Sequence, residues 1–387
     1  MTHSPPVKAL HLVVKISKYC NLRCTYCYEY LELANKQRMS LDQLRRMFEN
    51  VAHYAAESKL DAVSFIWHGG EPMLIPIDYY ESILAIQREV FAGKVQPSNA
   101  VQTNLTVLTE RHLEFLKRGH MFRGLGVSFD VYGNQRVDTQ GRLRTDAVLD
   151  NMQKLIDGGI PFGAIAVLAR DTVAHAPDIY RFYDRLGIES RFLPFYMSAT
   201  GEQVSRHALS FEEITTALKA VFEAWMESER ATPVDPIDEY IDYAVSYLTR
   251  APKRTYDKAT DETVYIVDVD GSTWGVAEAY DPAYRHGNIF DDRLASVFAS
   301  AGRQRSLRES AQRMDAHCSG CPYFGHCPGH FVGDATPEQQ HLLTDAGCPV
   351  REMISHIVVK LERAGISDDL LPPAGRKIEN QALRIGA

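Results

Sequence analysis

Seven cysteines fall into two groups that are separated by a long cysteine-free stretch. The groups are Cys20, Cys24 and Cys27, and then Cys318, Cys321, Cys327 and Cys348. An odd number of cysteines in a chain of 387 residues does not fit a disulfide framework, which is typical of small secreted domains. The cysteines therefore predict two separate metal sites with thiolate ligands.

The first group has the spacing C-x3-C-x2-C and follows the first predicted strand. Three thiolates within eight residues can bind three irons of a 4Fe-4S cubane, which leaves the fourth iron without a protein ligand. An open iron is a place for chemistry. The alternatives are a structural zinc site or a non-catalytic electron carrier, although both normally use four protein ligands.

Between residues 11 and 196, short apolar runs alternate with amphipathic stretches. The expected strands are 11–16, 62–67, 100–103, 124–129, 162–168 and 190–195, and the expected helices are 40–51, 78–91, 109–117, 145–156 and 176–186. Repeated strand-helix units predict a parallel sheet with helices outside. Six units predict an α/β fold with a partial (β/α)6 barrel, similar to a TIM barrel, whose functional loops follow the strands.

The pattern changes after residue 200. Two helices are expected over 210–227 and 237–250, and a hairpin is expected around Asp270 and Gly271. The expected organisation is a barrel over 1–200, a helical connection over 201–260, a cysteine-rich domain over 261–365 and a tail over 366–387.

Polar residues and glycines end three successive strands. Gly69, Gly70 and Glu71 follow the second strand, Thr103 and Asn104 end the third, and Ser128 ends the fourth. Parallel strands bring their carboxyl ends to one edge of the sheet, so these side chains are expected to share one rim. Taken singly, each is more often a turn residue or a strand-end cap.

Together, the cysteine spacing and these rim motifs resemble the radical SAM superfamily. The resemblance implies a 4Fe-4S cluster on Cys20, Cys24 and Cys27, whose open iron binds S-adenosylmethionine (SAM), and a 5′-deoxyadenosyl radical that abstracts a substrate hydrogen. The positions that it implies for SAM binding are Tyr26, Gly69, Gly70, Glu71, Thr103, Asn104, Ser128 and Arg142. For Arg142, an exposed surface arginine is the alternative.

The second group, C-x2-C-x5-C-x20-C, resembles the iron-sulfur extension called SPASM. Four cysteines imply one auxiliary 4Fe-4S cluster with Cys318, Cys321, Cys327 and Cys348 as ligands. A second auxiliary cluster is not expected, because the hairpin 268–279 contains no cysteine and His330 and Phe331 stand where another would be expected.

The single four-cysteine extension resembles that of enzymes that cross-link side chains in ribosomally made precursor peptides. The expected reaction is oxidative, with the loss of two hydrogens and a C–C bond of the cyclophane type. Formylglycine formation, as in anaerobic sulfatase maturases, and small-molecule dehydrogenation are the alternatives. Glu278 and Asp281 are candidate proton acceptors, and solvated surface carboxylates are the alternative for both.

The expected partners are a precursor peptide and an external electron donor of the flavodoxin or ferredoxin type. Only 19 residues precede Cys20, so leader recognition is expected to use the protein surface or a separate leader-binding protein. The chain has 42 basic and 50 acidic residues, which disfavours nucleic acid as a partner. Without a long apolar stretch or a signal peptide, a cytoplasmic protein with no membrane segment is expected.

Overall fold

A computed structural model describes residues 8–119, 122–344 and 347–363. The described strands form a ten-stranded sheet in the order β10-β9-β8-β1-β2-β3-β4-β5-β6-β7. The strands are β1 (Ala9–Lys15), β2 (Ala62–His68), β3 (Ser98–Thr103), β4 (Gly124–Ser128), β5 (Gly163–Leu168), β6 (Ser190–Pro194), β7 (Val234–Asp235), β8 (Val264–Val267), β9 (Ser272–Gly275) and β10 (Gly287–Asn288).

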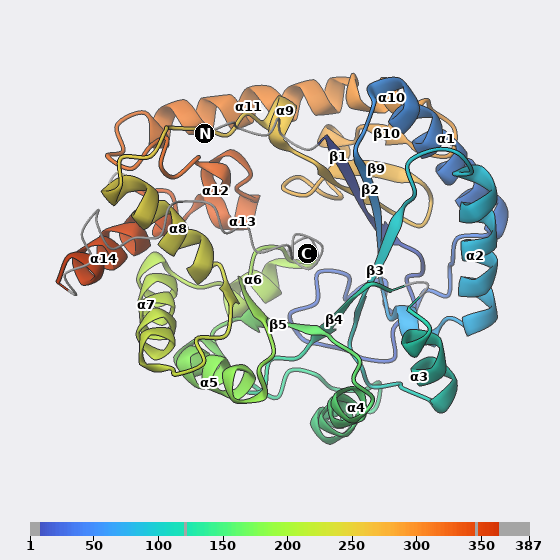
Figure 1. The fold of residues 1–387 in the computed structure, drawn as a ribbon, viewed down its shortest axis with the longest axis horizontal. Helices are drawn as coiled ribbons and strands as arrows, with labels where there is room; N and C mark the ends of the chain where they lie inside the picture. The colour runs from blue at the N-terminus through green and yellow to red at the C-terminus, as the bar shows by residue number, and fades with distance from the viewer. Residues whose placement is uncertain (1–7, 120–121, 345–346, 364–387) are drawn as a thin grey trace.

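Helices surround this curved sheet (Figure 1). They are α1 (Leu41–Ser58), α2 (Ile77–Val90), α3 (Glu110–Lys117), α4 (Thr145–Asp157), α5 (Ala176–Leu186), α6 (Gly201–His207), α7 (Phe211–Glu227), α8 (Ile237–Leu248), α9 (Lys258–Asp261), α10 (Leu294–Phe298), α11 (Ala301–Cys318), α12 (His330–Gly333), α13 (Pro337–Gln340) and α14 (Pro349–Arg363). None of the helices in these ranges is long and apolar enough to cross a membrane.

Strands β1 to β6 run parallel and in sequence order, and helices α1 to α5 connect them on the outer face (Figure 1). This arrangement confirms the predicted partial (β/α)6 barrel. Capping boxes begin two of the helices as the sequence predicts: Ser40 with Gln43 at α1, and Ser210 with Glu213 at α7. The side chains of these pairs hydrogen-bond each other's backbone N–H groups, which fixes where each helix begins.

Alternation along β1 determines which side chains face into the barrel. Val14 packs in the large core under the helices, whereas Val13 belongs to a separate cluster with Ile66. Successive side chains of a strand point to opposite faces, so Val13 and Ile66 lie on the concave face of the sheet. Two residues further on, Lys15 and His68 stand opposite each other in the β1–β2 register and face the same way.

The C-terminal part of the chain is joined to the barrel by the sheet itself. Strand β8 pairs in parallel with β1, and β9 and β10 continue the sheet as antiparallel strands. The predicted hairpin is therefore present, with Gly271 at φ +87° in its turn. Helix α14 packs against α7 and α8. The expected tail, 366–387, lies outside the described residues.

Helix α11 was not expected from the sequence. Its buried positions are mostly small or polar, among them Gly302, Arg303, Ser306 and Ser310. Such a helix carries little apolar periodicity, which is the main sequence signal for an amphipathic helix. It crosses the top of the molecule in Figure 1 and ends at Cys318, the first cysteine of the second group.

Candidate active site at the barrel rim

The loop that carries the first three cysteines is fixed by contacts from distant parts of the chain. The backbone N–H groups of Arg23 and Thr25 donate to the carbonyls of Val137 and Gln135, at 2.7 and 3.3 Å. From α6, the side-chain amide of Gln203 donates to the carbonyls of residues 25 and 27, at 2.9 and 3.0 Å. These bonds hold the cysteine loop over the carboxyl ends of the strands.

The two glycines after β2 let this loop approach the adjacent backbone closely. Gly69 and Gly70 have φ values of +82° and +39°, in the left-handed region that favours glycine. A Cβ atom at Gly70 would lie 2.2 Å from the carbonyl oxygen of Tyr19. The N–H of Glu71 donates to that same carbonyl at 2.9 Å. The glycine pair thus brings Glu71 beside the cysteine loop.

Glu71 is buried and accepts three hydrogen bonds, all from neutral groups. The donors are the Thr103 hydroxyl and the backbone N–H of Asn104, both at 2.7 Å, and the backbone N–H of Met73 at 2.8 Å. Burial raises the pKa of Glu71 above its ordinary value, although the hydrogen bonds oppose this shift. A buried carboxylate held by neutral donors suits a cationic ligand group, such as the amino group of SAM.

Asn104 links the third strand to the cysteine loop. Its side-chain amide donates to the Asn21 side chain at 3.1 Å and lies 3.6 Å from the Cys20 sulfur. On the next strand, Ser128 accepts a hydrogen bond from Gln102 at 2.7 Å. The structure therefore brings the predicted Glu71, Thr103, Asn104 and Ser128 to one rim, while Asn21 and Gln102 are contacts that the sequence motifs did not identify.

Tyr26 takes part in a buried network behind the cluster loop. Its hydroxyl donates to Asp130 at 2.6 Å, and Arg136 Nε donates to the same carboxylate oxygen at 2.9 Å. Arg142, by contrast, has a side chain that is 68% exposed and pairs with Asp138 at 2.8 Å. The position of Arg142 favours the surface alternative, and Arg136 is the buried arginine beside the cysteine loop.

Lys15 makes a second buried polar cluster on the concave face. It is fully buried, and its ammonium group hydrogen-bonds the Tyr28 hydroxyl. It also lies 3.1 Å from His68 Nδ1 and 3.4 Å from Glu29. Burial, followed by the charge of Lys15, lowers the pKa of His68 well below its ordinary value, so this imidazole is neutral. A lysine at the end of an apolar strand is the signal that could have identified this cluster.

The second cysteine group lies in the C-terminal part. Cys318, Cys321, Cys327 and Cys348 together line one small cavity with apolar neighbours such as Tyr323 and Val332. The segment between them is held by short-range bonds: the Cys321 N–H donates to the Cys318 carbonyl at 2.9 Å, and the Cys327 N–H to the Tyr323 carbonyl at 2.8 Å. Thiols from three separate segments therefore share one apolar site.

The chemistry of both cysteine groups fits iron-sulfur clusters. All seven cysteines are free thiols. Burial raises the pKa of both Cys20 and Cys318 to about 12, with the charges of Glu71 and of Cys348 as the next causes. A buried thiol is neutral without a metal, and bound iron makes the thiolate favourable because its positive charge replaces the proton.

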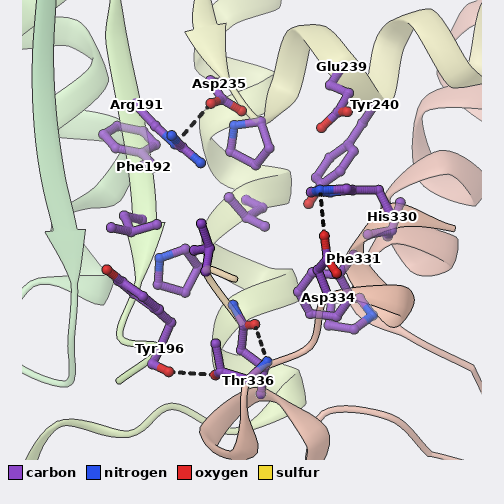
Figure 2. A pocket seen from close by; sticks show the side chains of 18 of the residues that line it. Arg191, Phe192, Tyr196, Asp235, Glu239, Tyr240, His330, Phe331, Asp334 and Thr336 are labelled. Carbon is purple, nitrogen blue, oxygen red and sulfur yellow. Dashed lines mark hydrogen bonds and ion pairs between the residues drawn. The ribbon is translucent and has the colours of Figure 1, made fainter. Parts of the chain in front are cut away.

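A larger cavity of about 430 Å³ opens between β6, β7 and the C-terminal part. Figure 2 shows the Arg191–Asp235 ion pair on one side of it and His330 with Asp334 on the other. Cys327 is part of its lining. This side cavity thus gives access to one ligand of the second cysteine group, and His330 lies here next to Asp334.

The two candidate proton acceptors have different surroundings. Glu278 is buried, accepts a hydrogen bond from Ser306 at 2.9 Å and lies 3.5 Å from Lys258. Asp281 is exposed and caps a short 3-10 turn by accepting from the Ala283 N–H at 2.8 Å. Both line the same cavity of about 570 Å³. Lys258 also pairs with Asp334 at 2.5 Å, so Glu278 belongs to a buried ionic cluster.

Comparison with known proteins agrees with this geometry. Residues 14–183 match the Radical SAM superfamily. The chain carries a radical SAM domain. It is an enzyme for radical-based chemistry, and the predicted cofactors, SAM and 4Fe-4S iron-sulfur clusters, are confirmed at the level of the family.

The radical SAM chain is similar to two curated enzymes over most of its length. It is 25% identical over 353 residues to a serine-type anaerobic sulfatase-maturating enzyme of Bacteroides thetaiotaomicron, covering 85% of this chain and 84% of that protein. It is 22% identical to a cysteine-type anaerobic sulfatase-maturating enzyme of Clostridium novyi, covering 83% of this chain and 87% of that protein.

Solved structures show the same fold. The structure of anSMEcpe with AdoMet and a peptide bound has a TM-score of 0.72 at 19% identity, and covers 92% of this chain and 99% of that chain. The structure of Streptococcus suis SuiB bound to precursor peptide SuiA has a TM-score of 0.56 at 16% identity, and covers 86% of this chain and 74% of that chain. The radical SAM fold with a cysteine-rich C-terminal part is thereby confirmed.

Proposed function

We propose that this radical SAM enzyme is a maturase that oxidatively cross-links two side chains of a ribosomally made precursor peptide. The observation that carries the proposal is the pairing of an open three-thiol site at the barrel rim with one closed four-thiol site in the C-terminal part. The likeness to sulfatase-maturating enzymes and to structures with bound peptides supports a peptide or protein substrate.

The proposed cross-link is a C–C bond of the cyclophane type. Joining two C–H groups in this way removes two hydrogens from the peptide. One leaves as a hydrogen atom and is recovered in 5′-deoxyadenosine, and the other leaves as a proton and an electron. SAM bound at the first cluster supplies the hydrogen-abstracting radical when an external flavodoxin- or ferredoxin-type protein donates one electron. We assign acceptance of the peptide's electron to the cluster of the second cysteine group.

The chain's own residues have distinct proposed roles. Cys20, Cys24 and Cys27 hold the first cluster, and the cofactor contacts are Tyr26, Gly69, Gly70, Glu71, Thr103, Asn104 and Ser128. Glu71 holds the amino group of SAM, because its buried carboxylate has only neutral donors around it. Of the two proton acceptors, we favour Glu278, since it is buried while Asp281 is exposed. Lys258 next to Glu278 would stabilise its carboxylate form.

Formylglycine formation in a sulfatase is the second candidate, and the similarity to sulfatase-maturating enzymes over 85% of the chain favours it. The cysteine content favours the peptide cross-link, because the hairpin 268–279 contains no cysteine for a further cluster. The two candidates differ in product: formylglycine carries an aldehyde, and a C–C cross-link carries none.

The test is co-expression with each short peptide that is encoded beside this gene, followed by intact-mass measurement under anaerobic conditions. A loss of two hydrogens, no reaction with a hydrazide and no fragmentation between two linked residues would support cross-linking. The Cys24→Ala variant is the control and should leave the peptide unchanged. A hydrazide-reactive product from a sulfatase peptide, with every short peptide unchanged, would replace the cross-linking proposal by formylglycine formation.

A further inference from the structure

Two adjoining cavities lie beside the cysteine loop, away from the side cavity of Figure 2. The first, of about 470 Å³, is lined by residues of the cysteine loop and of the β8–β9 hairpin. The second, of about 570 Å³, is lined by residues that follow β9 and by α11. Met197, Ser198 and Ala279 line both cavities. We call this pair of cavities the rim groove.

The rim groove is strongly acidic. The carboxylates of the first cavity are Glu29, Glu32, Asp268 and Asp270, and its basic side chain is Lys18. The carboxylates of the second cavity are Glu278, Asp281, Glu309 and Glu338, and its basic side chain is Arg313. The net charge of the whole chain is −8, so much of its negative charge is concentrated here.

Glu29 gives independent evidence for a ligand in this groove. Its side chain is 8% exposed and lines the first cavity. One carboxylate oxygen, Oε2, lies 3.4 Å from the Lys15 ammonium group. The other oxygen, Oε1, is buried and has no hydrogen-bond partner. A buried acceptor without a donor is unfavourable, so an incoming N–H group from a ligand would satisfy it.

The form of the groove favours a chain of cationic groups over a single ion. Its carboxylates are spread over two cavities, and within the described ranges no three His, Cys, Asp or Glu side chains could hold one metal ion. Aromatic rings are also present: Tyr28 and Tyr280 lie 5.9 Å apart and line the first cavity. Tyrosine faces attract lysine and arginine side chains through cation–π contacts.

We infer that the rim groove binds a lysine- or arginine-rich segment of the precursor peptide. This inference rests on the proposed peptide-maturase function and adds the class of peptide that the site prefers. A lysine or arginine N–H group donates to Glu29 Oε1, and the exposed carboxylates of Glu32 and Asp270 attract further cationic side chains.

The test compares two variants with the same change in net charge. The groove variant is Glu32→Gln, Asp270→Asn and Glu338→Gln, and the control variant is Glu57→Gln, Glu110→Gln and Asp150→Asn. The three control residues are exposed on α1, α3 and α4 and line none of the cavities described here. Far-UV circular dichroism and thermal unfolding show that both variants are folded.

The probes are two fluorescein-labelled peptides of alanine, glycine and serine, one carrying several lysines and one carrying glutamates at the same positions. Fluorescence anisotropy with the cluster-loaded enzyme measures binding. The lysine peptide should bind, the glutamate peptide should not, and added salt should weaken binding. The groove variant should lose about tenfold in affinity for the lysine peptide, and the control variant less than about twofold.

Equal losses in the two variants would show general attraction to an acidic protein and would overturn the inference. Equal binding of the lysine and glutamate peptides would overturn it as well. The binding assay needs no turnover, so its outcome is separate from that of the proposed function. Modification of a peptide that lacks basic residues would remove the groove preference and leave the maturase function standing.

Discussion

The two cysteine groups obtain their geometry in opposite ways. Cys20, Cys24 and Cys27 lie within eight residues, yet the loop that carries them is fixed by partners far away in sequence, such as Gln203 and Asn104. The second group spans more of the chain, yet its backbone is held by neighbours a few residues away. The short motif therefore depends on the whole barrel, whereas the longer one depends mainly on its own segment.

The largest expected effect separates the two groups by function. Cys24→Ala removes one of the three ligands of the first cluster, so SAM cleavage should fall to background. Cys321→Ala should retain SAM cleavage and lose the peptide product, because it affects only the second group. The measurement is 5′-deoxyadenosine and peptide mass from the same anaerobic reactions. If Cys321→Ala abolished SAM cleavage as well, the two sites would not be separable.

Glu71→Gln should have the next largest effect. The amide keeps the shape of the side chain but removes the charge that we assign to the SAM amino group. Losing a charge-assisted hydrogen bond should weaken SAM binding by about tenfold or more. Isothermal titration under anaerobic conditions measures this, with Glu57→Gln as the control on the outer face of α1. Unchanged affinity would show that Glu71 only supports the rim backbone.

Gly70→Ala tests how closely the cysteine loop packs on the barrel. The added Cβ would meet the Tyr19 carbonyl oxygen at 2.2 Å, and φ is +39°. Backbone strain and the clash together should reduce the free energy of unfolding by about 3 kcal/mol. Gly93→Ala is the matched control, because its φ is +71° and nothing lies within 4 Å. Its cost should be only about 1 kcal/mol, as measured by urea unfolding.

The smallest effect concerns buried histidines in the two parts of the chain. Burial lowers the pKa of His11 in β1 and of His286 before β10 from 6.5 to about 4. The folded protein therefore binds fewer protons than the unfolded chain between these values. Stability should be full above pH 6.5 and should fall as the pH drops toward 4, because each histidine must stay neutral in the fold.

The matched variants for this pH effect are His11→Phe and His286→Phe. Each should remove its own share of the pH dependence, about 2 kcal/mol or more between pH 6.5 and 4. Urea unfolding of the protein across this pH range measures the slope. A slope unchanged in both variants would mean that other groups cause the acid sensitivity.

The sequence predicted the barrel well because its strands are apolar runs bounded by clear helix caps. Strand β5 and helix α5 lie within one residue of their expected bounds. Helix α11 was missed, since its buried face consists of residues such as Ser306 and Ser310 rather than a periodic apolar stripe. Short elements such as β7 and β10 carry too few residues to give any periodic signal.

At the site, the sequence motifs named residues that end strands, and the structure brings most of them together. Contacts between segments far apart in the chain could not be predicted, because a single sequence holds no information on which loop meets which. Gln203 against the cysteine loop and Asp130 with Arg136 are such cases. Arg142 shows the converse, since proximity in sequence to the rim did not bring its side chain there.

The pairing of β8 with β1 has a consequence for how enzymes of this kind can be rearranged. His11 to Val14 align with Val264 to Val267, so the first strand of the barrel is shared between both parts of the chain. Cutting the protein before β8 would leave β1 as a bare edge with unpaired backbone groups, which invites aggregation. A transplanted C-terminal part must therefore bring a strand that matches this edge, so the two parts exchange as one continuous sheet rather than as separate beads.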